Sequence, residues 1–228
     1  MWRMAEDEGR HSADRDPDAY GLGRLLALSD GVFAIAMTLL VLSIPVPQLT
    51  SLQGERELTA ALWKVLPNVF GFAISFALVG LYWMVHHRIF RWVLRVDQRL
   101  QALNLMALFL ICLVPFPAAL EARYSNLLPA FELYCSNLAL IGIVYAALTA
   151  YLRRAGLMRE SHLPEWRISM CRNALGTAVF AFAMVIALVN IPVAGFSLLL
   201  LAPTNGVAKV LGNRWTDHVE RGSPKAVA

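Results

Sequence analysis

Six polar or ionisable side chains interrupt apolar stretches of the sequence, where such groups are costly and are candidates for function. They are Arg24, Ser29 and Asp30 in the first stretch, Trp83 and His86 in the second, and Asn104 in the third. A carboxylate, an imidazole and an amide brought together could pass protons, or could hold helices to one another through hydrogen bonds. Helix capping and ordinary helix–helix contacts explain the same residues without any special function.

The other charged residues of this region predict neither a metal site nor a voltage sensor. His86 and His87 are neighbours, and neighbours on a helix point about 100° apart, so the two rings do not meet at one metal ion. A series of arginines at three- and four-residue spacing lies outside the apolar stretches, where membrane topology explains it better. The series is Arg88, Arg91, Arg95 and Arg99.

The sequence contains no motif for hydrolytic or redox chemistry. It has no HExxH motif, no nucleophile–histidine–acid spacing and no pair of carboxylates deep in an apolar stretch. Cys112, Cys135 and Cys171 lie singly in apolar stretches, which is typical of small buried hydrophobic residues. We therefore expect no enzyme, no cofactor and no tightly bound metal.

The elements that must position these side chains are strongly apolar. Hydrophobic residues make up 58% of the 228 residues and charged residues 16%, against about 45–50% and about 25% in soluble domains. This composition excludes a soluble enzyme, a disordered chain and a disulfide-stapled secreted module. Residues 1–20 are polar and mixed in charge, which predicts a flexible cytoplasmic tail rather than a signal peptide.

Six apolar stretches approach or exceed the roughly 20 residues that a helix needs to cross a bilayer. They are Leu25–Ile44, Leu58–Val85, Leu100–Leu120, Leu127–Leu152, Ile168–Val189 and the shorter Val193–Val210. Helices are expected because they satisfy their own backbone polar groups in lipid, and the alternating pattern of barrel strands is absent. The sequence thus predicts an all-α polytopic membrane protein, with a six-helix domain over residues 21–212 and a cytoplasmic tail over residues 213–228.

The basic residues predict the orientation of these helices. All but three of the 20 lysines and arginines lie in the N-terminal segment, the second and fourth connections and the C-terminal end. The exceptions are Arg56, Lys64 and Arg123. Basic connections remain in the cytoplasm, so both termini are expected there in a multi-pass protein. The positive charge therefore reflects membrane topology, and the expected partner is the lipid bilayer rather than a nucleic acid.

One face of the first stretch is made of aliphatic side chains. Ile35, Leu39 and Leu42 follow one another at four- and three-residue spacing, which places them on one side of a helix with Thr38 beside them. Plain packing against another helix would produce the same pattern.

The first stretch also resembles the RxxxFSDGVFAIAxTLLxL opening of the prokaryotic transmembrane-protein-175 family, since residues 24–42 read RLLALSDGVFAIAMTLLVL. Matches continue in the second stretch at Ser75-Phe76, at residues 79–83 (VGLYW) and at residues 86–90 (HHRIF). The third stretch adds Asn104 and residues 115–117 (PFP). The motifs cover about residues 20–120, and the rest of the likeness is in helix count and length.

The resemblance implies a channel that passes K⁺ in preference to Na⁺. Prokaryotic members of the family carry one six-helix repeat and form homotetramers in the cell membrane, with the first helices lining a central pore. They lack the TVGYG filter of other potassium channels, and so does this sequence. Aligned on the motif, the constriction would consist of Ile35, Leu39 and Leu42, with Thr38 adding a layer of hydroxyls around the permeant K⁺.

The resemblance also gives the polar residues a structural role. In the family, polar groups of the first three helices hold the pore helix in place, and the corresponding residues are Arg24, Ser29, Asp30, Trp83, His86 and Asn104. Two positions depart from the family pattern. Leu28 replaces a phenylalanine, and Ser43 stands at the external mouth where relatives often carry a glutamate that would attract cations.

A proton-coupled secondary transporter that uses Asp30 and His86 as a relay is the main alternative. The sequence shows no internal inverted repeat and no pair of helices broken by glycine or proline at mid-membrane, which are the usual signs of such transporters. A purely structural membrane scaffold would leave the motif of the first stretch unexplained.

Overall fold

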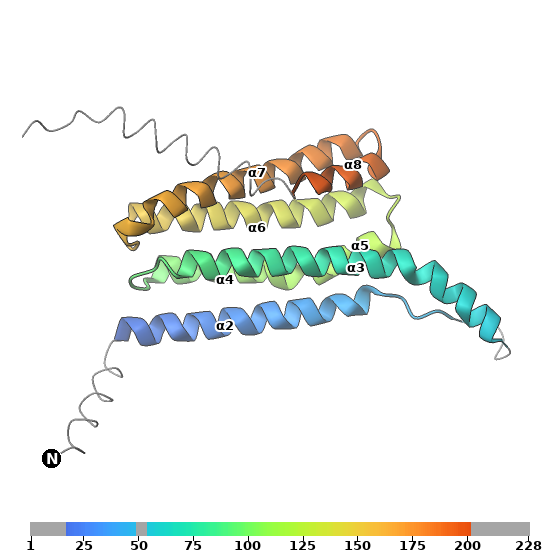
Figure 1. The fold of residues 1–228 in the computed structure, drawn as a ribbon, viewed down its shortest axis with the longest axis horizontal. Coiled ribbons are helices and arrows are strands. Elements are labelled where there is room, and N and C mark those ends of the chain that lie inside the picture. The colour runs from blue at the N-terminus through green and yellow to red at the C-terminus, as the bar shows by residue number, and fades with distance from the viewer. Residues whose placement is uncertain (1–16, 49–53, 202–228) are drawn as a thin grey trace, which may run out of the picture.

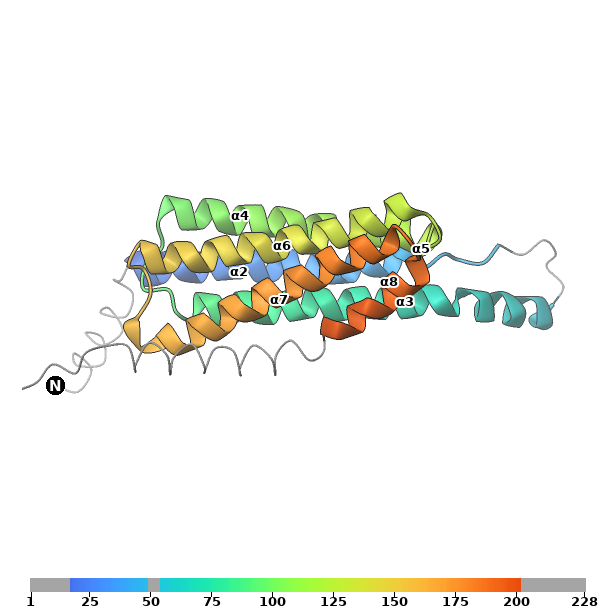
Figure 2. The same cartoon turned by 90° about the horizontal axis from the view of Figure 1, so that it is seen from above.

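A computed structural model describes residues 17–48 and 54–201 as a bundle of helices (Figures 1 and 2). The long elements are α2 (Pro17–Leu39), α3 (Glu55–Phe90), α4 (Gln98–Leu113), α6 (Leu128–Arg154) and α7 (Leu163–Ala187). Shorter helices extend or connect them: η1 (Leu40–Ser43), α5 (Pro115–Arg123), η2 (Glu160–His162), α8 (Ile191–Ser197) and η3 (Leu198–Leu201).

Within these described ranges, five helices are long and apolar enough to cross a membrane, and they coincide with the first five predicted spans. α2 continues into η1, and α4 into α5, so each of these pairs makes one span. The sixth predicted span, Val193–Val210, is described only as far as Leu201, as the end of α8 and η3. Its remainder and the predicted C-terminal tail lie outside the described residues. α2 begins at Pro17, inside the segment for which the sequence indicates a tail.

The second span is longer than the apolar stretch that predicts it. α3 starts at Glu55 and ends at Phe90, whereas the stretch covers Leu58–Val85. Acidic residues in the first turn of a helix and basic residues in its last turn stabilise the helix dipole, and α3 has both. Pro67 lies inside α3 and removes one backbone hydrogen bond. In Figure 1 the first part of α3 projects beyond the rest of the bundle.

The long helices run alongside one another (Figures 1 and 2). α2 packs against α3 and α4, α4 also packs against α6, and α6 makes its most extensive contact with α7. Gly142 allows this close approach, because a Cβ atom there would overlap Oγ1 of Thr177. One end of the bundle gathers the start of α2, the end of α3, the end of α6 and the start of α7 (Figure 1). We call it the basic end, because Arg88, Arg153 and Arg154 lie there.

Local sequence explains where several helices begin and end. The Asp97 carboxylate accepts a hydrogen bond from the Leu100 N–H at 2.8 Å and caps α4, and Asn190 caps α8 in the same way through the Val193 N–H at 3.1 Å. Pro115 begins α5, where a missing N–H costs little. Gly156 follows α6 with a φ of 65°, the left-handed conformation that often ends a helix.

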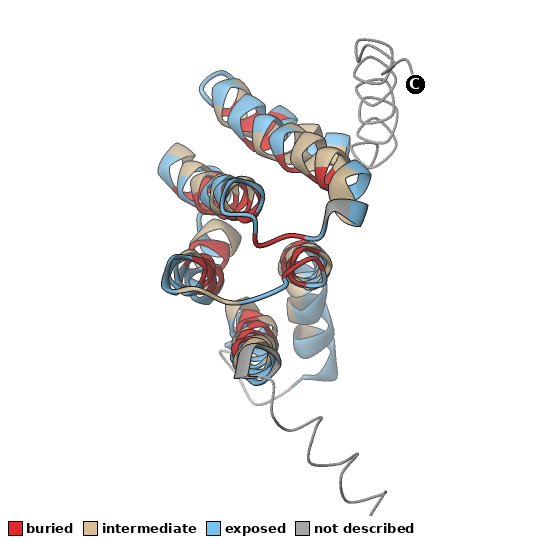
Figure 3. Ribbon diagram, turned by 90° about the vertical axis from the view of Figure 1, so that its left-hand side faces the viewer, coloured by how far each residue is buried: buried red, intermediate tan, exposed pale blue. Residues whose placement is uncertain are grey.

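Buried residues face the interior of the bundle, and exposed residues line its outside (Figure 3). Many of the exposed residues are large and apolar. Tyr145, Ile141 and Leu138 of α6 are fully buried, which makes α6 the centre of the core. An outer surface of exposed leucine, valine and phenylalanine side chains is unfavourable in water and suits a lipid environment.

Candidate functional site

α2, together with the η1 turn that continues it, has one face in the core and one face open. The buried residues Leu25, Ser29, Phe33, Ala36 and Leu40 recur every three or four positions and pack against the other helices. On the other side, Ile35 is 61%, Leu39 43% and Leu42 76% exposed. We call the exposed residues Leu28, Ile35, Thr38, Leu39 and Leu42 the open face of α2. The structure therefore brings all four predicted pore residues to one exposed surface.

Thr38 is the hydroxyl of the open face. It donates a hydrogen bond to the Ile35 carbonyl oxygen at 2.8 Å, one turn earlier in the helix. A hydroxyl group has a single hydrogen and two lone pairs, so this bond uses the hydrogen and leaves lone pairs as acceptors. Thr38 can therefore coordinate a cation through its oxygen without losing the bond to Ile35.

η1 continues the open face in a tighter 3₁₀ winding. The Ser43 hydroxyl donates to the Leu40 carbonyl oxygen at 2.7 Å within this turn, and Ser43 is half-buried. Its oxygen is thus held close to the backbone at the end of the helix. Ser43, the residue that the family resemblance puts at the external mouth, is thus small and neutral.

A buried hydrogen-bonded triad ties α2, α3 and α4 together. Its members Ser29, His86 and Asn104 are all 0% exposed. The Asn104 amide donates to Ser29 Oγ at 3.1 Å, and His86 Nε2 lies 2.9 Å from Asn104 Oδ1. These three residues come from the three matched stretches of the sequence, so the structure joins half of the predicted polar network in one chain of bonds.

The direction of each bond in the triad follows from its neighbours. Ser29 gives its only hydrogen to the Leu25 carbonyl oxygen at 2.8 Å, so it must accept from the Asn104 NH₂ group. The Asn104 carbonyl oxygen then faces His86, and an oxygen of this kind only accepts. His86 Nε2 therefore carries the proton. Its ring packs between Phe33 and Phe90, at centroid distances of 5.7 and 4.3 Å.

A second cluster lies nearer the surface and contains Asp30, Trp83 and His87. The Trp83 indole N–H donates to Asp30 Oδ1 at 2.9 Å, and His87 Nδ1 lies 3.7 Å from the same oxygen. The Asp30 and His87 side chains are 46% and 43% exposed. The structure thus separates Asp30 from His86: each has its own partners, although both sit between α2 and α3.

Arg24 stands apart from both clusters. It is exposed, and its guanidinium lies over the Tyr20 ring at 5.8 Å from the centroid. Among the described residues it makes no ion pair with Asp30. The two charges are six positions apart on α2, which turns them to different sides of the helix.

The site also uses residues that the motif reasoning did not assign. Phe33 and Phe90 sandwich His86, and His87 approaches Asp30. The signal was present, because Phe33 lies four positions after Ser29 and Phe90 four after His86, on the same helix faces. In the described ranges, no three histidine, cysteine or acidic side chains gather as they would around a metal ion.

Comparison with known proteins places these helices in a family. The family described as endosomal/lysosomal potassium channel TMEM175 matches residues 24–115, which contain both clusters and the open face. A potassium channel of Streptomyces collinus is 34% identical over 178 residues, covering 75% of this chain and 84% of the relative. An endosomal/lysosomal proton channel TMEM175 of Danio rerio is 31% identical over 129 residues, 56% of this chain but only 24% of the relative.

A solved structure agrees with the fold. The crystal structure of a lysosomal potassium-selective channel TMEM175 homologue from Chamaesiphon minutus superimposes with a TM-score of 0.70 at 31% identity. The match covers 83% of this chain and 98% of that one. The family matches the motif region, and the similarity extends over most of the length of these two bacterial relatives. This chain therefore belongs to the TMEM175 family.

Proposed function

We propose that four copies of this chain assemble into a channel that conducts K⁺ in preference to Na⁺. The open face of α2 is the observation that carries this proposal. Ile35 and Leu42 remain exposed although the opposite side of the helix is fixed in the core by Ser29 and Phe33. Relatives with this fold are named as potassium channels, and a ring of copies would turn the open face toward a common axis.

The pore would be narrowest at aliphatic side chains. Rings of Ile35, Leu39 and Leu42 offer no hydrogen bonds to water, and hydrophobic constrictions of this kind gate by losing their water. Conduction then requires an ion to give up part of its hydration shell. K⁺ holds its shell less tightly than Na⁺, so such a constriction favours K⁺.

Thr38 would replace part of the lost hydration. Its hydroxyl oxygen has free lone pairs because the hydrogen is bonded to the Ile35 carbonyl. Thr38 lies between Ile35 and Leu42 along the helix, so a layer of hydroxyl oxygens would separate two aliphatic layers.

The buried triad and the Asp30 cluster would hold α2 at a fixed rotation. A hydrogen bond between buried partners is directional, so the Ser29–Asn104–His86 chain allows one orientation of the open face. In this proposal the basic end faces the cytoplasm of a prokaryotic cell, because Arg88, Arg153 and Arg154 gather there.

Replacement of Ile35 by asparagine tests the proposal directly. The purified full chain, reconstituted in liposomes, should conduct K⁺ with little accompanying proton movement. Ile35→Asn should wet the constriction, raise the K⁺ current several-fold and bring the K⁺ and Na⁺ permeabilities closer together.

Val185→Asn is the matched control. Val185 is 63% exposed on α7, similar to Ile35, so it tests the effect of one exposed asparagine elsewhere on the bundle. Its current should equal that of the unmodified protein. Equal currents and selectivity in Ile35→Asn and the unmodified protein would remove Ile35 from the pore.

The transporter alternative gains no support from the site. A relay from Asp30 to His86 needs the two groups in one hydrogen-bonded chain, but Asp30 bonds to Trp83 and His86 bonds to Asn104. Saturable K⁺ transport with a fixed number of protons per ion would nevertheless favour the transporter over the channel.

A further inference from the structure

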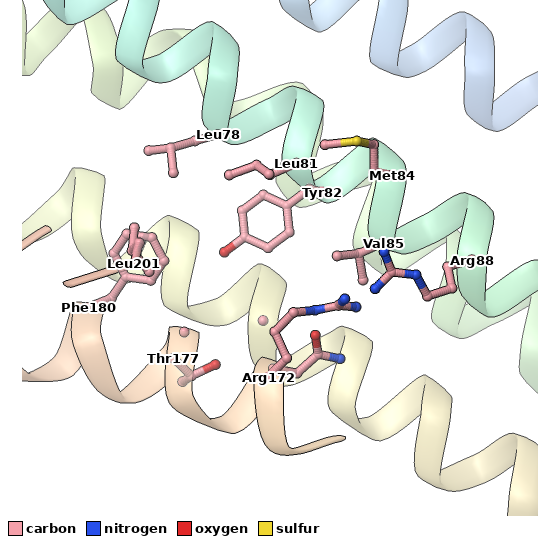
Figure 4. Close-up of a pocket in the computed structure, with 13 residues that line it drawn as sticks. Leu78, Leu81, Tyr82, Met84, Val85, Arg88, Arg172, Thr177, Phe180 and Leu201 are labelled. Atoms are coloured by element: carbon pink, nitrogen blue, oxygen red, sulfur yellow. The ribbon is translucent and has the colours of Figure 1, made fainter. Parts of the chain in front are cut away.

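A pocket of about 300 Å³ lies between α3, α6 and α7, away from α2 and its open face. Most of its wall is apolar, with Leu78 and Leu81 from α3 and Phe180 from α7. Figure 4 shows that Leu201 and Phe180 lie at one end of the pocket and Arg88 and Arg172 at the other. The pocket is therefore long and amphipathic, with an apolar body and a cationic end.

The cationic end is built from two different helices. Arg88 extends from α3 and Arg172 from α7, and their guanidinium groups approach the same space below Val85 (Figure 4). In the described part of the chain, neither arginine forms an ion pair with an acidic side chain. Two like charges that converge without a counter-charge indicate a place for an anion.

Buried donors at this end also lack acceptors. The Asn173 side chain lines the pocket and is only 9% exposed, and its Nδ2 has no hydrogen-bond partner among the described residues. Nε of Arg172 is likewise buried without a partner, and its NH2 group reaches Ser169 Oγ only at 3.4 Å. Buried polar groups are almost always satisfied, so these donors imply a bound acceptor.

Small residues keep the apolar body open. Gly176 lines the pocket, and a Cβ atom there would meet no other atom within 4 Å. Leu81 and Met84 at the rim are 44% and 48% exposed, so the pocket opens to the outer surface of the bundle, where lipid would lie.

We propose that this pocket binds an anionic phospholipid, with the phosphate between Arg88 and Arg172 and an acyl chain along Leu78, Leu81 and Phe180. Basic pockets between membrane-spanning helices on the cytoplasmic side suit such headgroups. The proposal rests on the orientation in the proposed function, because Arg88 lies at the basic end. The Asn173 amide donates a further hydrogen bond to the phosphate.

Lipid binding is measured on the purified full chain by native mass spectrometry, with phosphatidylglycerol and phosphatidylcholine as probes. Phosphatidylglycerol should bind at least several-fold more tightly, and Arg88→Gln/Arg172→Gln should remove this preference. Arg91→Gln/Arg95→Gln is the matched control: it deletes two exposed charges from the connection after α3 and should keep the preference. Equal loss in both double variants would overturn the pocket, because general surface charge would then explain the binding.

A second variant tests the apolar body and leaves both arginines in place. Gly176→Leu fills open space and should weaken binding of phosphatidylglycerol without disturbing the fold. If millimolar inorganic phosphate alone displaced phosphatidylglycerol, the site would be one for a free anion, and the proposal of a lipid site would be wrong. Absence of any headgroup preference in the unmodified protein would mean that the chain itself or a neighbouring copy fills the pocket, and would also overturn it. These assays require no ion current, so their failure is distinct from failure of the channel proposal.

Discussion

The two halves of the bundle are held together by different kinds of contact. In the first half, α2–α4, a buried hydrogen-bonded triad connects three helices through side chains. In the second half, α6 and α7 approach closely at Gly142 and Thr177, and one buried hydrogen bond joins them, from the Trp166 indole N–H to the Thr149 carbonyl oxygen at 2.9 Å. Directional bonds fix the rotation of a helix about its axis, whereas close packing fixes its distance from the neighbouring helix. The half that carries the open face is thus the half in which a chain of side-chain hydrogen bonds fixes three helices relative to one another.

The largest effect is expected at the centre of the triad. Asn104→Leu leaves His86 Nε2 without a partner in the core and removes the bond that Ser29 Oγ accepts, although Ser29 still donates to the Leu25 carbonyl oxygen. An unsatisfied buried group costs about 1–3 kcal/mol. Loss of the proposed tetramer and a large fall in the midpoint of thermal unfolding in detergent should follow. Asn137→Leu is the control, because Asn137 makes one long bond of 3.3 Å to the Leu110 carbonyl oxygen. Equal falls in the unfolding midpoint of the two variants would contradict the special role of the triad in the first half.

A smaller effect is expected from forcing α6 and α7 apart. Gly142→Leu places a large side chain against Thr177 and the Asn173 backbone, and overpacking of this kind typically costs about 1–3 kcal/mol. The folded protein should unfold at lower temperature while its K⁺/Na⁺ selectivity stays the same, because α2 is not involved. Gly176→Leu, which enters open space on α7, should change the unfolding midpoint little. Altered selectivity in Gly142→Leu would show that the second half also sets the pore.

The smallest effect is expected where the two halves meet. Tyr151 of α6 donates a hydrogen bond to Asp97, the residue that caps α4, and this bond holds the pKa of the Asp97 carboxyl below its ordinary value. The stabilisation is therefore present above about pH 4 and is lost as the pH falls through the lowered pKa. Asp97 is only half-buried and solvent screens its charge, so the change should be small.

Tyr151→Phe removes that hydroxyl and keeps the ring. Unfolding midpoints measured between neutral pH and pH 3 should fall more steeply for the unmodified protein than for the variant. Parallel curves for the two proteins would assign the acid sensitivity to other carboxylates.

The helices were predictable because apolar length alone marks a membrane span, and the first five predicted spans are helices here. The exposed side of α2 was predictable because Ile35, Thr38 and Leu42 share one face by spacing. Partners across helices were harder. Spacing puts Asp30 and His86 near the same end of the bundle. The rotation of α3 about its axis then decides the partners: Asp30 bonds to Trp83, and His86 bonds to Asn104.

The lipid pocket had no signal in the sequence. Arg88 and Arg172 are far apart in the chain, and each is explained by the orientation of its own helix. Only the fold, which puts α3 and α7 on two walls of one pocket, brings their guanidinium groups together (Figure 4). Contacts between distant helices depend on interhelical angles and on small residues such as Gly176, which periodicity does not report.

The length of α3 has a consequence for how the protein meets its surroundings. At 1.5 Å per residue, its 36 residues span about 54 Å, well beyond a hydrocarbon core of about 30 Å. The excess lies at the end opposite the basic end, where Pro67 and the polar residues Arg56 and Lys64 are found. In the proposed orientation, the first turns of α3 would therefore extend past the lipid on the side away from the cytoplasm and remain in water.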